Sequence, residues 1–395
     1  MRIAVLHASN QGFFPRFYAQ ERDAALSCGH DVRLFVPLTR RNLSNPLADQ
    51  VTYGSRLNFP LHFLFYRLTG IQDVLSITAT LQLCLQLWRW KPDVVHLNVI
   101  QECKVNFPML AFVLNRLCCP VVWTFHDCRS FTGRCSYYSM SGCEKWMSGC
   151  GGCPADGLYS PSLVDASSFM WSLRSRVMRS IRRLHIVCPS EWMACQVRKS
   201  FLSHVPLRVI RNGVDLSAFR FGCDIRKERM ILAVASSWSL RKGLDTVCWL
   251  AERMEPDVRI VVVGDIPVTL SERHPRIEYA GRIVETAELA GLFSRATVFV
   301  NPTLEDNFPT VNIEALASGT PVVTYSSGGS AECLSEDCGI SVSSGNREAF
   351  LEAVNFVLAH PERFSPESCM RRAGDFSACQ YGRYIEFFED LQNGK

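Results

Sequence analysis

The sequence predicts an α/β protein with two doubly wound domains, and three observations lead to that fold class. A chain of 395 residues is longer than one ordinary hydrophobic core requires, so two domains of similar size are expected. Short apolar, β-branched runs alternate with helix-length segments, a pattern typical of a parallel sheet. The alternation occurs twice, once in each half of the chain.

The first series of predicted strands occupies the amino-terminal half. Its members are Ile3–Leu6, Val32–Val36, Val94–Leu97, Val121–Phe125 and Ile186–Cys188. The opening apolar run stops at His7, which is too short for the core of a signal peptide. The stretches Leu81–Trp90 and Phe112–Phe125 are broken by polar residues before they could span a bilayer. We therefore expect a cytoplasmic protein, free or held peripherally on the inner face of the cytoplasmic membrane.

The second series of strands follows a polar junction. Its members are Ile231–Ala235, Ile260–Val263, Val298–Val300, Val322–Tyr325 and Ile340–Val342. The turn dipeptide Asn212-Gly213 lies between the two series and predicts domains at 1–212 and 213–372. Apolar residues at helical spacing in Asp375–Leu391 predict a terminal helix within 373–395. The spacing leaves open which domain this helix packs on, and a return to the amino-terminal domain is one interpretation.

Composition narrows the class of protein further. The 18 cysteines do not indicate a secreted disulfide scaffold, because the chain is large and shows no export signal, so we interpret them as reduced thiols. The net charge of +4 is too small to indicate a nucleic-acid partner by itself.

The most informative loop runs from Asn301 to Gly319. In doubly wound sheets, ligands bind at the carboxyl ends of strands, where helix N-termini present unpaired amides. Asp306 lies in this loop and Glu314 in the first turns of the next helix, so both carboxylates can accept hydroxyls of a sugar and a ribose in one pocket. The spacing alone fits a solvent-facing loop acid and a surface glutamate equally well.

The segment Glu314-Ala-Leu-Ala-Ser-Gly-Thr-Pro-Val322 resembles the acidic signature of the family-4 retaining glycosyltransferases. The resemblance implies the GT-B fold, in which two Rossmann-like domains face each other across a cleft. It also implies that Glu314 binds the donor ribose and that Asp306 binds the donor sugar. Asp306 stands where the family has glutamate, and Asn307 and Pro309 replace two glycines. The donor-binding turn implied in this way comprises Asn307, Phe308, Pro309, Thr310 and Val311.

A second loop, Ala235–Gly243, carries Lys242 before a glycine at a predicted helix start. A cation and helix amides there would stabilise the charge on a departing nucleoside diphosphate, although Arg-Lys-Gly alone is more often a solvated turn. The resemblance aligns Lys242 with the phosphate-binding lysine of the family. The arginine that usually stands five residues earlier is Ser237 here, and we expect Arg241 to supply that charge.

Four further loops complete the set of site residues that the resemblance implies. Gly264, and Arg282 with Ile283, resemble the next two loops of the family, the second of which receives the nucleotide base. His126 ends a predicted strand and resembles a family histidine that reaches the donor sugar, whereas a lone histidine at such a position is usually structural. Gly12 stands where the family often carries a glycine pair near the phosphates.

Cysteines gather in the segment 128–154, directly after His126. The spacing of Cys135, Cys143, Cys150 and Cys153 suits a tetrahedral zinc site, which would be structural because four thiolates leave no position for water. Free thiols in a glycine-rich loop and a redox pair are the alternatives. The segment resembles cysteine-bearing insertions in some bacterial polysaccharide glycosyltransferases of the same family, and no metal is expected to act in catalysis.

A basic amphipathic helix is predicted between Phe169 and Leu184. Its cations are Arg174, Arg176, Arg179, Arg182 and Arg183, and no acid stands among them. One interpretation buries the apolar stripe in the core and leaves the arginines in water. The other places the arginines on anionic lipid.

The resemblance implies transfer of a sugar from a nucleoside-diphosphate sugar to a saccharide or polyprenyl-linked acceptor, with retention of configuration, in bacterial cell-surface polysaccharide biosynthesis. The catalytic residues expected are His126, Asp306, Lys242 and Arg241. The rival hypotheses are a sugar-nucleotide epimerase or phosphorylase of the same fold and a zinc-ribbon protein that binds nucleic acid. The acidic loop and the two sheets argue against the second rival, so no nucleic-acid partner is expected.

Overall fold

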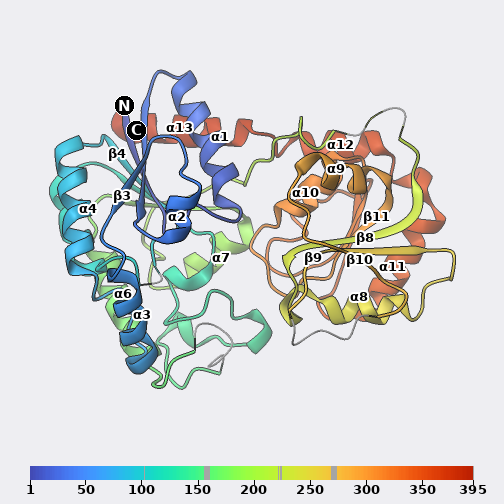
Figure 1. The fold of residues 1–395 in the computed structure, drawn as a ribbon, viewed down its shortest axis with the longest axis horizontal. Helices are drawn as coiled ribbons and strands as arrows, with labels where there is room; N and C mark the ends of the chain where they lie inside the picture. Colours follow the sequence, from blue (N-terminus) through green and yellow to red (C-terminus); the bar gives the residue numbers. More distant parts are fainter. Residues whose placement is uncertain (102, 155–160, 221, 223–224, 268–273, 395) are drawn as a thin grey trace. The chain divides into compact units, whose positions relative to one another are not determined.

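The computed structural model describes residues 1–395 apart from 102, 155–160, 221, 223–224, 268–273 and 395. Its internal contacts divide the chain into two compact units (Figure 1). Unit 1 comprises Met1–Arg211 and Tyr381–Lys395, and unit 2 comprises Asn212–Gln380. Each unit contains a parallel sheet between layers of helices, so the predicted class of two Rossmann-like domains is confirmed.

The sheet of unit 1 has seven strands in the order β3-β2-β1-β4-β5-β6-β7, and its neighbouring strands pair in parallel. The strands are β1 (Arg2–Leu6), β2 (Asp31–Pro37), β3 (Gln50–Tyr53), β4 (Val94–Leu97), β5 (Val121–Thr124), β6 (Leu184–Cys188) and β7 (Leu207–Val209). Both faces of the central strands are covered, which explains why they read as continuous apolar runs.

Helices pack on both faces of this sheet and form a separate hydrophobic core on each face. The helices of unit 1 are α1 (Phe14–Ser27), α2 (Arg40–Ser44), α3 (Asn58–Thr69), α4 (Ile77–Trp90), α5 (Phe107–Leu117), α6 (Ser167–Ser180), α7 (Glu191–Lys199) and α13 (Cys379–Gln392). Because side chains alternate along a strand, Ile3 and Val5 of β1 join a core with α1 and α13, whereas Ala4 and Leu6 join a core with α4 to α7.

Unit 2 repeats this plan with six strands in the order β10-β9-β8-β11-β12-β13. The strands are β8 (Glu228–Ser237), β9 (Arg259–Asp265), β10 (Glu278–Gly281), β11 (Ala296–Asn301), β12 (Val322–Tyr325) and β13 (Gly339–Val342). The helices are α8 (Leu244–Ala251), α9 (Thr286–Arg295), α10 (Thr310–Ala317), α11 (Arg347–Ala359) and α12 (Pro366–Gly374). One face of the sheet packs against α9, α10 and α12, and the other packs against α8 and α11.

The chain leaves unit 1 after Arg211 and returns to it at Tyr381. The two ends of unit 2 lie side by side, because Val214 and Ser377 form a parallel bridge and the amide of Val214 donates to the carbonyl of Phe376 at 2.9 Å. The returning helix α13 contributes Tyr381, Tyr384 and Phe388 to a core of unit 1. The boundaries expected from the sequence lie after residues 212 and 372.

Across the part of the chain that the structure describes, none of the helices combines the length and the apolar character that crossing a bilayer requires.

Candidate functional site

The loops at the carboxyl ends of β8 and β11 bring a predicted cation and a predicted acid into contact. The ammonium of Lys242 lies 2.6 Å from Oδ2 of Asp306, and the two side chains are 20% and 15% exposed. A short 3₁₀ turn, Leu240–Lys242, places the lysine at the start of α8. Partial burial strengthens this ion pair relative to a surface pair, so the two groups hold each other at the edge of the sheet.

Arg241 braces the acidic loop from inside unit 2. Its guanidinium donates to the carbonyl of Glu305 at 2.6 Å, and its own carbonyl accepts from the amide of Leu304 at 2.8 Å. The two loops are therefore joined through both the side chain and the main-chain carbonyl of Arg241. This arrangement gives Arg241 a positioning role beside Lys242, in addition to the charge that it brings.

A glycine loop after β12 closes over Asp306, although no role was predicted for it from the sequence. The amide of Gly329 donates to the carbonyl of Asp306 at 3.1 Å. Gly328 has a φ of +57°, and a Cβ added there would lie 1.8 Å from that same carbonyl oxygen. Only glycine permits this approach. The pair Gly328-Gly329 directly after a buried strand was the available signal.

Glu314 lies in α10, a helix that Pro309 begins without a capping side chain among the described residues. Its side chain is buried, with the residue 9% exposed. Asn312, two residues earlier in the helix, accepts from the side-chain amide of Asn301 at 2.7 Å and donates to the carbonyl of Ser330 at 2.9 Å. These buried bonds fix the end of β11, the start of α10 and the glycine loop in one arrangement.

The remaining predicted residues of the turn and the adjacent loops also lie at this edge of the sheet. Asn307, Phe308 and Pro309 are buried, and Thr310 and Val311 are half-buried. Gly264, one residue before the end of β9, lies so close to β8 that an added Cβ would be 1.7 Å from the carbonyl oxygen of Ala235. The next residue, Asp265, forms an exposed ion pair with Arg282 at 3.5 Å, next to the half-buried Ile283.

In unit 1, His126 follows β5 and is half-buried. Its Nε2 lies 2.8 Å from Oδ1 of Asn98, and the rings of Phe13 and Phe17 contact it edge-on. Burial, together with the nearby His96, lowers the pKa of His126 to about 3. The imidazole is therefore neutral at physiological pH and can donate or accept a hydrogen bond, and it carries no charge.

Two further histidines lie at the ends of neighbouring strands, and the sequence analysis gave them no role. Burial, and next the proximity of the His126 imidazole, lower the pKa of His7 to about 3, and its ring stacks on Phe14 at 3.6 Å. His96, within β4, bonds Glu21 at 2.5 Å and is wholly buried. Gly12 lies in an exposed turn before α1 with a φ of +71°.

Comparison with known proteins identifies the family of this chain. Residues 22–218 match the family model described as Glycosyltransferase Family 4, and residues 228–360 match the model described as Glycosyl transferases group 1. The chain belongs to the family-4 glycosyltransferases. This assignment confirms the resemblance seen in the sequence.

Individual relatives agree with this family. The glycosyltransferase is 27% identical to the putative colanic acid biosynthesis glycosyl transferase WcaC of Escherichia coli, over 76% of this chain and 77% of that protein. It is 26% identical to the alpha-maltose-1-phosphate synthase of Mycolicibacterium smegmatis, over 45% of this chain and 54% of that protein.

Solved structures share the fold. The sucrose-phosphate synthase of Thermosynechococcus elongatus superposes with a TM-score of 0.70 at 17% identity, over 100% of both chains. HepE of Anabaena, solved in complex with UDP, superposes with a TM-score of 0.66 at 12% identity, over 99% of this chain and 100% of that one. The fold of this glycosyltransferase is therefore GT-B.

The cysteine segment of the glycosyltransferase contains three short 3₁₀ turns, and its four candidate zinc ligands line one pocket. Burial is the main cause that raises the pKa of the Cys150 thiol to about 12, and the neighbouring cysteines contribute to this shift. Burial raises that of Cys135 to about 11. Within the described residues, no group of three or more His, Cys, Asp or Glu side chains is arranged to hold a metal ion. The zinc site of Cys135, Cys143, Cys150 and Cys153 thus stays a prediction.

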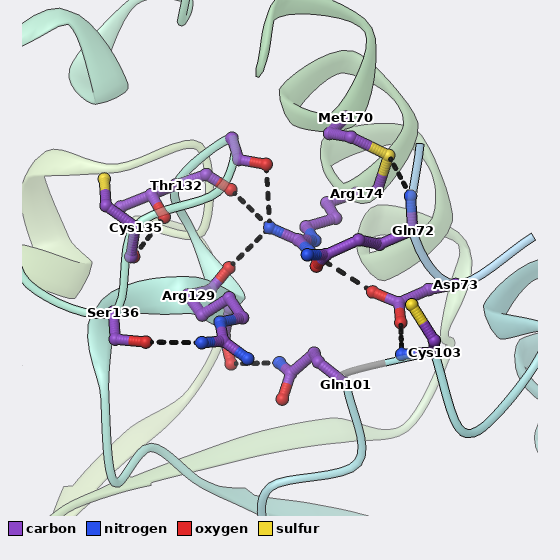
Figure 2. A network of polar contacts seen from close by, with 12 residues as sticks. Gln72, Asp73, Gln101, Cys103, Arg129, Thr132, Cys135, Ser136, Met170 and Arg174 are labelled. Atoms are coloured by element: carbon purple, nitrogen blue, oxygen red, sulfur yellow. Dashed lines mark hydrogen bonds and ion pairs between the residues drawn. The ribbon is translucent and has the colours of Figure 1, made fainter. Parts of the chain in front are cut away.

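Arg174 is buried, so neither interpretation of the basic helix, arginines in water or arginines on anionic lipid, holds for this residue. Figure 2 shows its guanidinium inside a polar network, where it pairs with Asp73 at 3.2 Å and donates to the carbonyls of Arg129, Thr132 and Gly133 at 3.0, 2.9 and 3.1 Å. The arginine is only 2% exposed, and its guanidinium supplies hydrogen bonds to buried carbonyls of the loop that carries the cysteines.

The other arginines of the predicted basic helix are exposed but do not form one helical face. Arg176 and Arg179 lie on α6, which ends at Ser180. Arg182 and Arg183 follow the helix, and Arg183 donates to the carbonyl of Cys118 at 2.7 Å.

Proposed function

We propose that this glycosyltransferase moves a sugar from a nucleoside-diphosphate sugar to a saccharide or polyprenyl-linked acceptor with retention, in the synthesis of bacterial cell-surface polysaccharide. The observation that carries the proposal is the contact between Lys242 and Asp306 at the carboxyl edge of the unit 2 sheet. A cation for phosphate and an acceptor for sugar hydroxyls stand side by side there. The similarity to a protein named for colanic acid biosynthesis supports the role in surface polysaccharide.

In the proposed reaction, the bond between the anomeric carbon and the phosphate oxygen of the donor breaks. A bond forms from the acceptor hydroxyl oxygen to the same face of that carbon, and the hydroxyl proton goes to the leaving phosphate. The Lys242 ammonium and the amides at the start of α8 and α10 offset the charge that develops on the diphosphate. No step of this chemistry is routed through a metal ion.

The other residues bind and orient the donor in this proposal. Glu314 accepts the ribose hydroxyls, and Asp306, fixed by Gly329 and Arg241, accepts hydroxyls of the sugar. Gly12 and the loop of Gly264 lie near the phosphates, and Arg282 with Ile283 receives the base. Neutral His126 contributes a hydrogen bond to the sugar.

The donor is identified by thermal-shift measurements with UDP-, GDP- and ADP-sugars, because a ligand that binds only the folded state raises its melting temperature. Release of nucleoside diphosphate is then measured with and without saccharide and polyprenyl acceptors, and the anomer of the product is assigned by NMR. If the protein transfers the sugar, nucleoside diphosphate is released only when an acceptor is present. Free sugar or an epimer formed without an acceptor contradicts the proposal and supports an epimerase or phosphorylase.

The site is tested with Lys242→Ala and Glu314→Ala. We expect each substitution to lower the transfer rate by about 10²-fold or more, because each removes a polar contact to the reacting donor. The matched control is Glu348→Ala, an exposed glutamate in the first turn of α11 in the same unit. Full activity in Glu314→Ala would show that the site is placed wrongly.

A further inference from the structure

Helix α3 presents an apolar stripe to solvent. Leu57, Leu61, Leu64 and Leu68 are 69%, 63%, 57% and 52% exposed. They follow one another at intervals of four, three and four residues, so they share one side of the helix. The buried side carries His62 and Tyr66 instead. This pattern is the reverse of an ordinary surface helix, which buries its leucines.

Helix α4 carries a second exposed stripe. Ile77, Leu81, Leu85 and Trp88 are 53%, 51%, 47% and 54% exposed. Its opposite side packs in the core of unit 1 through Ala79, Leu83, Cys84 and Leu87. The helix is therefore apolar on both sides, although among the residues that the structure describes only one side is covered.

The two stripes begin at the same place in unit 1. The amide of Asn58, next to Leu57, donates to the hydroxyl of Thr78, next to Ile77, at 3.0 Å. His62 of α3 bonds Ser76, which precedes α4, at 2.8 Å. We call the two stripes together the apolar face. It comprises Leu57, Leu61, Leu64, Leu68, Ile77, Leu81, Leu85 and Trp88.

The exposed charges in the stretch of sequence that carries the apolar face are of one sign. Between residues 54 and 91 the cations are Arg56, Arg67, Arg89 and Lys91, all exposed. Asp73 is the single acid in that stretch of sequence, and it is buried in the ion pair with Arg174. The neighbouring α5 adds exposed Phe112 and Arg116, and its sequence contains no acid.

We propose that the apolar face inserts into the headgroup region of an anionic lipid membrane. Exposed leucines and a tryptophan bordered by arginines and lysine have the composition of an interfacial membrane contact, in which apolar side chains enter the lipid and cations bind its phosphates. A second copy of the chain would bring the same cations against one another and is disfavoured by that repulsion.

The inference extends beyond sugar transfer and does not depend on it. It places unit 1 on the membrane through α3 and α4, in place of the α6 arginines that the sequence suggested. A membrane-held enzyme would meet a lipid-linked acceptor at the surface where that acceptor resides.

The experiment measures co-sedimentation of the full chain with two kinds of vesicle, phosphatidylcholine alone and an equal mixture of phosphatidylcholine and phosphatidylglycerol. We expect binding to the mixed vesicles that decreases with added salt and is much weaker on phosphatidylcholine alone. The double variant Leu61→Glu/Leu85→Glu should bind at least about tenfold more weakly, because each change removes a leucine from the lipid. Leu26→Glu on α1, 43% exposed and outside the apolar face, is the matched control and should bind like the parent.

Circular dichroism and donor-induced thermal shift verify that each variant is folded and still binds nucleotide. A parent chain that stays in the supernatant with the mixed vesicles, or a double variant that binds as well as the parent, overturns the inference. Light scattering without lipid adds a further check. A parent dimer that the double variant splits into monomers would identify the apolar face as a chain–chain interface and would also overturn it.

Discussion

At the scale of single residues, Asp306 is held by contacts from three directions. Lys242 pairs with its carboxylate, Arg241 binds the preceding carbonyl, and Gly329 donates to its own carbonyl. These contacts keep the short Asp306 side chain in one position, although its loop lacks the two glycines that the family carries there. Its geometry therefore depends on Gly329, which has no side chain, as well as on the two cations.

Substitution of Gly328 by alanine tests this dependence. The added Cβ would meet the carbonyl oxygen of Asp306 at 1.8 Å, so we expect a loss of about 2 kcal/mol or more in the free energy of unfolding and weaker donor binding. Gly345→Ala is the control, because Gly345 also has a positive φ, +78°, but has no atom within 4 Å of the added Cβ. It should cost only about 1 kcal/mol. Equal losses in urea unfolding would contradict the steric explanation.

The lowered pKa values of His7 and His126 predict how the free energy of unfolding varies with pH. Burial lowers the pKa of His7 and His126 from 6.5 to about 3, so between these values the unfolded chain binds more protons than the folded chain. Their contribution to stability is therefore complete above pH 6.5 and decreases as the pH falls toward 3. Thermal unfolding between pH 7.5 and 5 measures this decline. His126→Gln should make it shallower and exposed His204→Gln should not; identical curves for His126→Gln and the parent would refute the assignment.

At the scale of elements, the sequence predicted the inner strands and missed three at the edges. The strands β3, β7 and β10 each end a sheet. They are short and only partly buried, as the segment Glu278–Gly281 of β10 illustrates, so they lack the apolar run that marks a central strand. These strands are defined by backbone pairing with one neighbouring strand, and such pairing leaves no periodic pattern of apolar side chains in the sequence.

The site shows the same division between local and long-range information. Glu314 could be predicted because its motif is contiguous. The contact of Lys242 with Asp306 joins residues 64 positions apart, and Gly328 acts on a loop from a different strand. Arg174 was misplaced for the same reason: its helix is basic in sequence, but its partners come from Gln72, Asp73 and the loop after β5.

The buried position of Arg174 predicts a large effect of its removal. Arg174→Met would leave Asp73 and three carbonyls without their donor, so we expect a loss of about 3–5 kcal/mol. Arg176→Ala on the same helix is exposed and should change stability by less than about 0.5 kcal/mol. Both values come from urea unfolding, and similar values for the two variants would contradict the role of the network.

Metal analysis decides the chemistry of the cysteine segment. Four cysteines around one pocket predict about one zinc per purified chain and its loss in Cys150→Ser/Cys153→Ser. Burial raises the pKa values of the Cys135 and Cys150 thiols, and bound zinc would keep these groups deprotonated as thiolates. The control is the substitution of exposed Cys195 by serine, which should retain the metal. A parent chain without zinc would remove the hypothesis.

At the scale of the whole molecule, unit 1 depends on both ends of the chain. Tyr381, Tyr384 and Phe388 of α13 complete the core on one face of its sheet, and the hydroxyl of Thr124 bonds that of Tyr384 at 3.3 Å. Without α13, that face of β1 and β4 would lose part of its cover.

Fragments test this completion. Residues 1–211 alone should aggregate or unfold, since each lost aromatic contributes about 2 kcal/mol and a whole domain is stable by only 5–15 kcal/mol. The same fragment joined to residues 381–395 by a flexible glycine-serine linker should recover solubility and a cooperative thermal transition. Equal solubility and melting of the two fragments would show that α13 is dispensable.

The side-by-side ends of unit 2, at Val214 and Ser377, have a consequence for how such enzymes diversify. One uninterrupted stretch of gene encodes the whole of unit 2, and its product begins and ends at a single point of its surface. Recombination that exchanges this stretch can replace the unit as an intact module. Unit 1 cannot be inherited in that way, because its sheet and the helix that covers it are encoded on either side of the stretch for unit 2.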